Sequence, residues 1–149
     1  MLAIGTLAGC TTTAETSGGG GGGLPSALTA RMDQQGATLD RASALALVNS
    51  YRSTVGAAPL AADAGLDATA QSLASAYAST GSAPGKPDGV VAVRSSAGYG
   101  NFAETFSGWR NSPADAAALG SRPAQRAGIA SVYNPSSSYG VYWVLVLDE

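Results

Sequence analysis

The sequence predicts an α+β domain in which helices cover both faces of a small antiparallel sheet, giving a three-layer α-β-α sandwich. Residues 139–147 alternate so that both faces of a strand would be apolar, and such a strand needs cover from both sides. Residues 126–133 form a second strand, and the turn-forming residues 134–138 between the two predict a hairpin. Upstream of this hairpin, apolar residues recur at helical spacing between turn signals.

Composition limits the chemistry that this chain can perform. Its 149 residues suffice for one domain with a sizeable core, and a net charge of -2 without basic runs gives no reason to expect a nucleic-acid partner. There is no histidine, the side chain best suited to proton transfer near neutral pH. Cys10 is the only cysteine, so neither an intramolecular disulfide nor a thiolate zinc site can form. These absences argue against most hydrolytic mechanisms.

Residues 1–10 are apolar and end in Leu-Ala-Gly-Cys, which resembles the lipobox of bacterial lipoproteins. The stretch is too short to span a bilayer and fits the end of a signal segment. The resemblance implies that Cys10 is acylated and anchors the protein to a membrane of the cell envelope. Thr11 after the cysteine implies the outer membrane, facing the periplasm or the surface. The alternative is an apolar start with a chance cysteine.

Residues 11–38 are rich in Thr, Ser and Gly, with six consecutive glycines at 18–23. Such a segment cannot bury enough apolar surface to offset the entropy of ordering it, so we expect a flexible tether. Residues 24–32 are a candidate short helix within it. The folded domain is then expected to occupy residues 39–149.

Two helices are expected at the start of this domain. Asp40 is placed to cap the first, which Gly56 ends, and Asp63 is placed to cap the second, which ends by Gly81. The residues expected on their buried faces are Ala44, Val48, Tyr51 and Val55 in the first helix and Leu66, Ala70, Leu73 and Tyr77 in the second.

A short strand is expected at residues 90–93, and a third helix at residues 101–111, with Phe102, Phe106 and Trp109 on its buried face. Asn101 can cap this helix. Glu104, three residues later, can return a hydrogen bond to it, as in a capping box.

Ser112 is expected to cap a fourth helix, with Pro113 in its first turn. Asp115 would then complete a second capping box. There its carboxylate would accept from a backbone N–H and interact with the positive end of the helix dipole.

Residues 109–119 resemble the Trp-x-x-Ser-Pro-x-His-x-x-x-Leu signature of bacterial CAP domains, the SCP/pathogenesis-related-1 superfamily, with Asp115 in place of the histidine. Residues 49–60 resemble the first-helix pattern of the same family, Asn-x-x-Arg followed by a Gly-x-x-Pro-Leu turn. The two predicted C-terminal strands resemble its closing strands, so the resemblance covers residues 39–149. It implies the same three-layer sandwich.

The resemblance also shows what this chain lacks. CAP domains typically hold two histidines and two acids in a cleft that can bind a divalent metal, and only Asp115 keeps a plausible ligand here. Val93 and Arg94 align with the Glu and Asn of the family's Gly-Glu-Asn segment. Because zinc sites take three or four ligands, we expect no metal and no cofactor. Asn49 and Arg52 are interpreted as structural residues that hold the following turn, with a ligand role as the alternative.

We therefore expect a non-catalytic envelope lipoprotein whose degenerate CAP cleft binds a small apolar or glycan-like ligand, or a protein partner. The alternatives are a metal-independent hydrolase acting on peptide or cell-wall material, and a surface protein with no ligand. For Glu104 and Asp115, the capping roles compete with a binding role, and Trp109 is a further candidate that we interpret as core. The candidate ligand-binding residues are Tyr99, Asn101, Glu104, Arg110, Ser112 and Asp115.

Overall fold

A computed structural model describes residues 24–149 of the chain. The elements in this range are α1 (Ser26–Thr29), α2 (Arg41–Thr54), β1 (Ala61–Ala62), α3 (Ala64–Thr80), β2 (Ala92–Ala97), α4 (Phe102–Asn111), α5 (Pro113–Leu119), β3 (Arg126–Tyr133) and β4 (Val141–Asp148).

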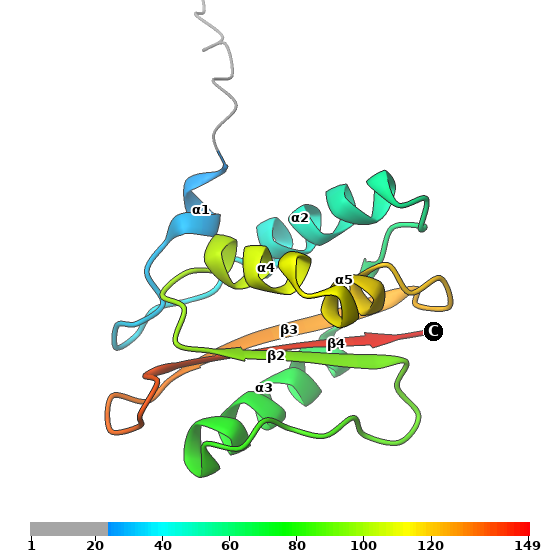
Figure 1. The fold of residues 1–149 in the computed structure, drawn as a ribbon. Coiled ribbons are helices and arrows are strands. Elements are labelled where there is room, and N and C mark those ends of the chain that lie inside the picture. Colours follow the sequence, from blue (N-terminus) through cyan, green and yellow to red (C-terminus); the bar gives the residue numbers. More distant parts are fainter. Residues whose placement is uncertain (1–23) are drawn as a thin grey trace, which may run out of the picture.

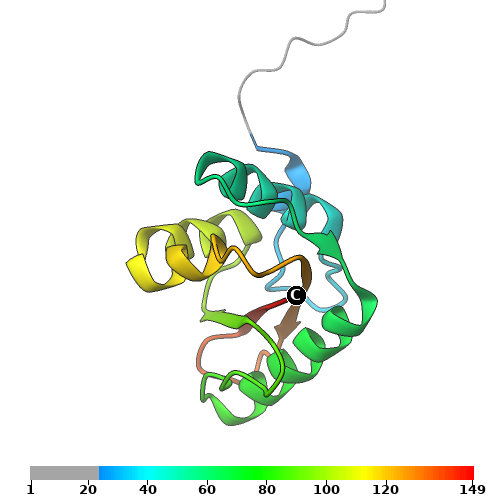
Figure 2. The same ribbon diagram turned by 90° about the vertical axis from the view of Figure 1, so that its right-hand side faces the viewer.

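The strands form one sheet in the order β1-β3-β4-β2, and helices cover both of its faces (Figures 1 and 2). Helices α2, α4 and α5 lie on one side of the sheet, and α3 lies on the other. β4 pairs antiparallel with both β3 and β2. The three-layer sandwich is therefore confirmed. The sheet departs from a purely antiparallel one only at β1, which pairs with β3 in parallel and which the sequence did not predict.

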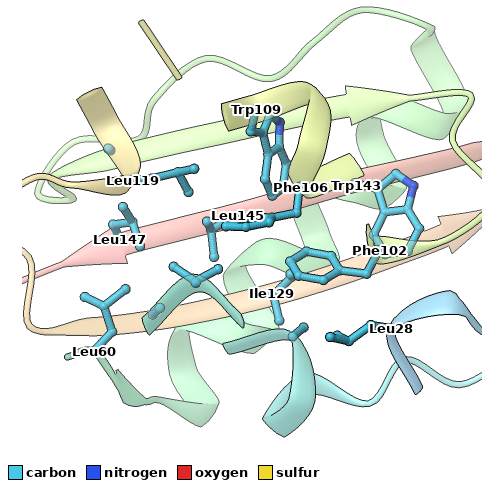
Figure 3. Packing of buried hydrophobic residues seen from close by; sticks show 14 of the residues in the cluster. Leu28, Leu60, Phe102, Phe106, Trp109, Leu119, Ile129, Trp143, Leu145 and Leu147 are labelled. Atoms are coloured by element: carbon cyan, nitrogen blue, oxygen red, sulfur yellow. The ribbon is translucent and has the colours of Figure 1, made fainter. Parts of the chain in front are cut away.

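The predicted hairpin forms the centre of the molecule. β3 spans the expected residues, and all residues of β4 are buried except Asp148. Trp143, Leu145 and Leu147 point into the core beneath α2, α4 and α5 (Figure 3), whereas Val144 and Val146 belong to the smaller core beside α3. The expectation of a strand buried on both faces is confirmed.

The caps predicted for α2 and α3 are both present. Oδ1 of Asp40 accepts from the backbone N–H of Ser43, and Oδ1 of Asp63 accepts from that of Leu66, each at 2.9 Å. Gly81 ends α3 with a φ of 71°, in the left-handed region that favours glycine. Val55 lies beyond the end of α2 and is exposed, so its predicted place on the buried face was wrong.

Helix α3 contacts the sheet through small residues. Ala70, Ala74 and Ala78 are buried along it, while Leu73 and Tyr77, predicted as part of its buried stripe, are only half-buried. At the start of α3, a Cβ added to Gly128 of β3 would be 2.0 Å from the backbone carbon of Leu66. The backbones of α3 and β3 are too close for a larger side chain at that point.

Strand β2 begins two residues later than the predicted strand and runs to Ala97. It pairs with β4 along its whole length, from Ala92 opposite Leu147 to Ala97 opposite Tyr142. Its polar residues, Arg94 among them, concealed this strand because they interrupt the apolar run.

The packed region begins upstream of residue 39. Helix α1 lies within the candidate segment 24–32, and Leu28 and Met32 are buried in the main core. Cys10 and the six glycines lie outside the described residues. None of the helices in residues 24–149 combines the length and the apolar character that a membrane crossing requires.

Candidate functional site

Asn49 and Arg52 of α2 hold the turn that follows this helix, as predicted. The side-chain amide of Asn49 both donates to the carbonyl of Leu60 (3.0 Å) and accepts from its N–H (2.8 Å). Arg52 is fully buried, and its guanidinium donates to the carbonyls of Ala58, Leu119, Ser121 and Ala124 at 2.7–3.1 Å. Burial lowers the pKa of the Arg52 guanidinium, because desolvation disfavours its charged form. Both residues are structural.

Asn101 and Glu104 lie at the start of α4, and only half of the predicted capping box is present. Oδ1 of Asn101 accepts from the backbone N–H of Glu104 at 2.9 Å. The carboxylate of Glu104 is exposed and returns no hydrogen bond to Asn101 in the described part of the chain. The predicted return bond from Glu104 was therefore wrong.

Trp109 belongs to the core, as interpreted from the sequence. Its ring is buried, and Nε1 donates to the carbonyl of Ser95 in β2 at 3.1 Å. Tyr99 lies nearby on the surface with 41% of its area exposed, and its ring covers Gly108 of α4. A Cβ added to Gly108 would be 3.1 Å from the Tyr99 hydroxyl, so this contact depends on the glycine.

Arg110 lies on the side of α4 that faces α2. Its guanidinium carbon is 5.8 Å from the ring centroid of Tyr51 and 5.9 Å from that of Phe106. Both distances fit cation–π contacts, which exposed sites make with modest strength. Arg110 is thus directed away from β2, the strand that Trp109 contacts.

Ser112 does not cap α5 with its side chain, so this prediction was wrong. Pro113 removes one of the N–H groups that would need a cap, and Ala114 is exposed to water. Asp115 also makes a different bond from the one predicted. Its Oδ1 accepts from Nη1 of Arg94 in β2 at 2.8 Å instead of from a backbone N–H.

The Arg94–Asp115 pair occupies the place that the CAP resemblance gives to the metal cleft. The two side chains are 27% and 29% exposed, and Nε of Arg94 is buried without a partner among the described residues. A guanidinium bound to the carboxylate repels a divalent cation and removes its ligand. Across residues 24–149 no three His, Cys, Asp or Glu side chains gather as metal ligands. Arg94 and Asp115 therefore do not fit the divalent metal that CAP domains typically can bind in this cleft.

The six predicted binding residues lie in the segment from Tyr99 to Asp115, and none of them lines the cavity described below. Asn101 and Glu104 lie at the start of α4, Ser112 follows its end, and Arg110 and Asp115 contact different neighbours. A cavity that the sequence analysis missed lies elsewhere, between α2, the sheet edge and the start of α3. We call it the α2–β3 cavity. It has a volume of about 250 Å³ and is lined by Arg41, Ala42, Leu45, Val48, Ala62, Asp67, Ala127, Gly128, Ile129 and Leu145.

Two charged residues form the polar part of the α2–β3 cavity. Nε of Arg41 donates to the carbonyl of Ile129 (2.7 Å), and Oδ1 of Asp67 accepts from the N–H of the same residue (2.9 Å). The two charged groups are 3.7 Å apart. β1 pairs with β3 only at Arg126 and Ala127. At Ile129 the two side chains therefore bond to the backbone N–H and carbonyl that no neighbouring strand reaches. The other lining residues are apolar.

The described residues form an α-β-α sandwich like that of CAP domains. Within this range the sandwich lacks the cluster of metal ligands that CAP domains typically hold. A family model described as CAP, the cysteine-rich secretory protein family, matches residues 45–147. The chain belongs to this family. No curated protein sequence matches it.

Solved structures of the family share the fold. An outer surface protein from Borrelia burgdorferi superposes with a TM-score of 0.60 at 14% identity, over 74% of this chain and 92% of that one. The protein MpPR-1i gives 0.60 at 18% identity, over 72% and 89%. A cysteine-rich secretory protein from Staphylococcus aureus gives 0.54 at 15% identity, over 72% of this chain and 38% of that one.

Proposed function

We propose that this CAP domain is a non-catalytic binding module of the cell envelope that takes a small apolar ligand into the α2–β3 cavity. The observation that carries the proposal is the cavity itself, apolar except for one Arg–Asp pair. Binding sites for small molecules combine apolar walls with a few convergent polar groups in this way. The Arg94–Asp115 pair supports a role other than the family's metal chemistry.

The size of the α2–β3 cavity limits the ligand. An apolar cavity of about 150 Å³ holds benzene, and this one has about 250 Å³. Sites for drug-sized molecules begin at about 300 Å³. The ligand is therefore a short acyl chain or a single ring with a small substituent.

The charges at the cavity limit the head group. Arg41 and Asp67 carry opposite charges and pair with each other, so the net charge of the two side chains is zero. Each also bonds to the backbone of Ile129. A carboxylate would be attracted by Arg41 and repelled by Asp67. An ammonium group would be repelled by Arg41 and attracted by Asp67. A neutral hydroxyl or amide can donate to Asp67 and accept from Arg41 without this penalty. We therefore propose a neutral amphiphile.

A hydrolase receives less support from the site. Ser112, the serine beside the family signature, is followed three residues later by Asp115, whose carboxylate is already held by Arg94. A serine nucleophile needs a free base within hydrogen-bonding reach. Turnover of ester or peptide probes that is lost in Ser112→Ala would support the hydrolase instead.

The test compares 1-octanol with octanoate as probes of the purified chain. We expect octanol to raise the melting temperature in a saturable manner, because a ligand bound only to the folded state stabilises it. Octanoate should raise it less at the same concentration. Ala62→Leu places a larger side chain at the cavity wall and should weaken octanol binding by about tenfold or more.

Ala61→Leu is the matched control, since Ala61 is the neighbouring residue of β1, is exposed like Ala62 and does not line the cavity. Successive residues of a strand face opposite sides, so this variant should bind octanol as the natural chain does. Absence of octanol binding, or equal loss in both variants, would contradict the proposal.

We further propose that the module is attached to the membrane through an acylated Cys10, which lies outside the described residues. The support is the Leu-Ala-Gly-Cys sequence, with Thr11 indicating the outer membrane. Several acyl chains on a mature lipoprotein anchor it stably, whereas one does not. Cys10→Ser should move the protein from the membrane fraction to the soluble one, and an unchanged distribution would refute the anchor.

A further inference from the structure

A second hollow lies between the C-terminal end of α3 and the turn that joins β3 to β4. We call it the α3–hairpin hollow. It has a volume of about 280 Å³, and its lining comprises residues 78–81 at the end of α3, Asn134 and residues 136–139 of the turn, and Tyr142 of β4. None of these residues carries a charge at neutral pH, and most end in a hydroxyl or an amide. It shares no lining residue with the α2–β3 cavity.

An exposed aromatic ring forms one wall of this hollow. Tyr139 is 58% exposed, the most of any large hydrophobic residue among those described. Its ring meets the ring of Tyr142 edge-to-face at a centroid distance of 6.3 Å, and Tyr142 meets Tyr77 at 4.8 Å. Tyr142 is buried, so the exposed ring is supported by a fixed one. Burial raises the pKa of Tyr77, which keeps its phenol neutral.

The turn that carries Tyr139 is held by its own hydrogen bonds. Nδ2 of Asn134 donates to the carbonyl of Ala78 in α3 (3.0 Å), and Oδ1 accepts from the N–H of Ser136 (3.1 Å). The hydroxyl of Ser137 donates to the carbonyl of Asn134 (2.6 Å) and accepts from the N–H of Gly140 (3.2 Å). These bonds fix the turn against α3 before any ligand arrives, which lowers the entropic cost of binding.

Two hydroxyls of the turn remain available. Ser136 and Ser138 are exposed, and their side chains take no part in the hydrogen bonds that hold the turn. They flank the same hollow as the ring of Tyr139. The hollow thus offers a rigid aromatic face beside free hydroxyl groups, with no ionic group in its lining.

We propose that the α3–hairpin hollow binds a neutral carbohydrate. A sugar ring has an apolar face of C–H groups, which can stack on Tyr139, and a rim of hydroxyls, which can bond to Ser136 and Ser138. A phosphorylated or sulfated ligand would find no cation in the lining, and a purely apolar one would leave the serine hydroxyls without partners. This proposal does not depend on the α2–β3 cavity.

The test is calorimetric titration of the full chain with two neutral probes, cellotriose and triacetylchitotriose. We expect at least one to bind with a Kd of about 1 mM or below, unchanged by 0.5 M NaCl because no charge lines the hollow. Tyr139→Ala should weaken binding by about tenfold, and Tyr139→Phe should retain it because the ring is kept. The double variant Ser136→Ala/Ser138→Ala should also weaken binding by about tenfold.

Val55→Ala is the control, because Val55 is an exposed hydrophobic residue that does not line the hollow. It should bind the probes as the natural chain does. Failure of both trisaccharides to bind at about 10 mM, or equal binding by Tyr139→Ala and the natural chain, would overturn the proposal. If Tyr139→Ala lowers the melting temperature, the serine variant and Tyr139→Phe decide the result.

Discussion

Two arginines, Arg52 and Arg94, show how differently this domain treats its scaffold and its former site. Arg52 is fully buried and bonds four backbone carbonyls, joining the end of α2, the turn after it and the segment after α5. Arg94 is partly exposed and bonds one carboxylate, that of Asp115. Arg52 belongs to a family pattern that this chain keeps, and Arg94 lies where the family pattern has changed. We therefore expect the stability of the fold to depend strongly on Arg52 and little on Arg94.

The largest expected effect in this comparison is that of Arg52→Met. The variant removes a buried cation and leaves four carbonyls without their donor. Each unsatisfied buried group costs about 1–3 kcal/mol, and partial relaxation should limit the total loss of unfolding free energy to about 3–5 kcal/mol. Denaturant unfolding measures it.

Arg122→Met is the matched control for this variant, since Arg122 is exposed. It should change the unfolding free energy by no more than about 0.5 kcal/mol. A loss below about 1 kcal/mol in Arg52→Met would mean that water replaces the guanidinium, and the contrast between the two arginines would disappear.

Asn49→Ala should have the next largest effect. It removes the donor and the acceptor that hold both backbone groups of Leu60, next to β1. Because these groups are part-buried, we expect a loss of about 1–3 kcal/mol in the free energy of unfolding. The control is Ser50→Ala, whose exposed hydroxyl bonds only within α2. Comparable losses in the two variants would show that the turn needs no side-chain support.

The scaffold was predictable from the sequence where the determinants are local. Asp40, Asp63 and Asn101 each cap a helix that starts at the next residue, and the hairpin follows from two apolar runs beside a turn sequence. Arg52 was identified through its family pattern, which also predicted that it supports the turn.

The sites were not predictable, because their contacts join distant segments. Arg94 and Asp115 are 21 residues apart, and Arg41 meets Ile129 across 88 residues. The local pattern predicted that Asp115 caps α5. Its carboxylate instead forms a charge-assisted hydrogen bond with Arg94 of β2. The two-residue β1 carries no periodicity to recognise, and the cavity beside it depends on that short strand.

Arg94→Ala should cost little by comparison with Arg52→Met. A partly exposed ion pair contributes about 0–1 kcal/mol to stability. A double-mutant cycle with Asp115→Ala measures the coupling between the two side chains, which we expect within that range. Control measurements on Arg126→Ala, which loses the ion pairs with Asp63 and Asp148, give the scale for such bonds in this chain. A coupling several times larger would show that the cleft is part of the scaffold after all.

The smallest expected effect is a dependence of stability on acid that comes from the helix caps and not from Arg52, whose carbonyl partners do not titrate. The N–H groups of Ser43 and Leu66 lower the pKa of Asp40 and Asp63, and Arg126 lowers that of Asp63 further. A carboxyl group whose pKa is lower in the folded state stabilises the fold above its unfolded pKa, and this contribution is lost as the pH falls through the folded value. The melting temperature should therefore be level between pH 8 and pH 5 and should fall below a pH of about 4. Asparagine caps helices as well as aspartate does, so Asp40→Asn/Asp63→Asn should keep the helices and reduce this acid-induced fall. An identical fall in the double variant would show that the two helix caps do not cause the acid sensitivity, and would contradict this prediction.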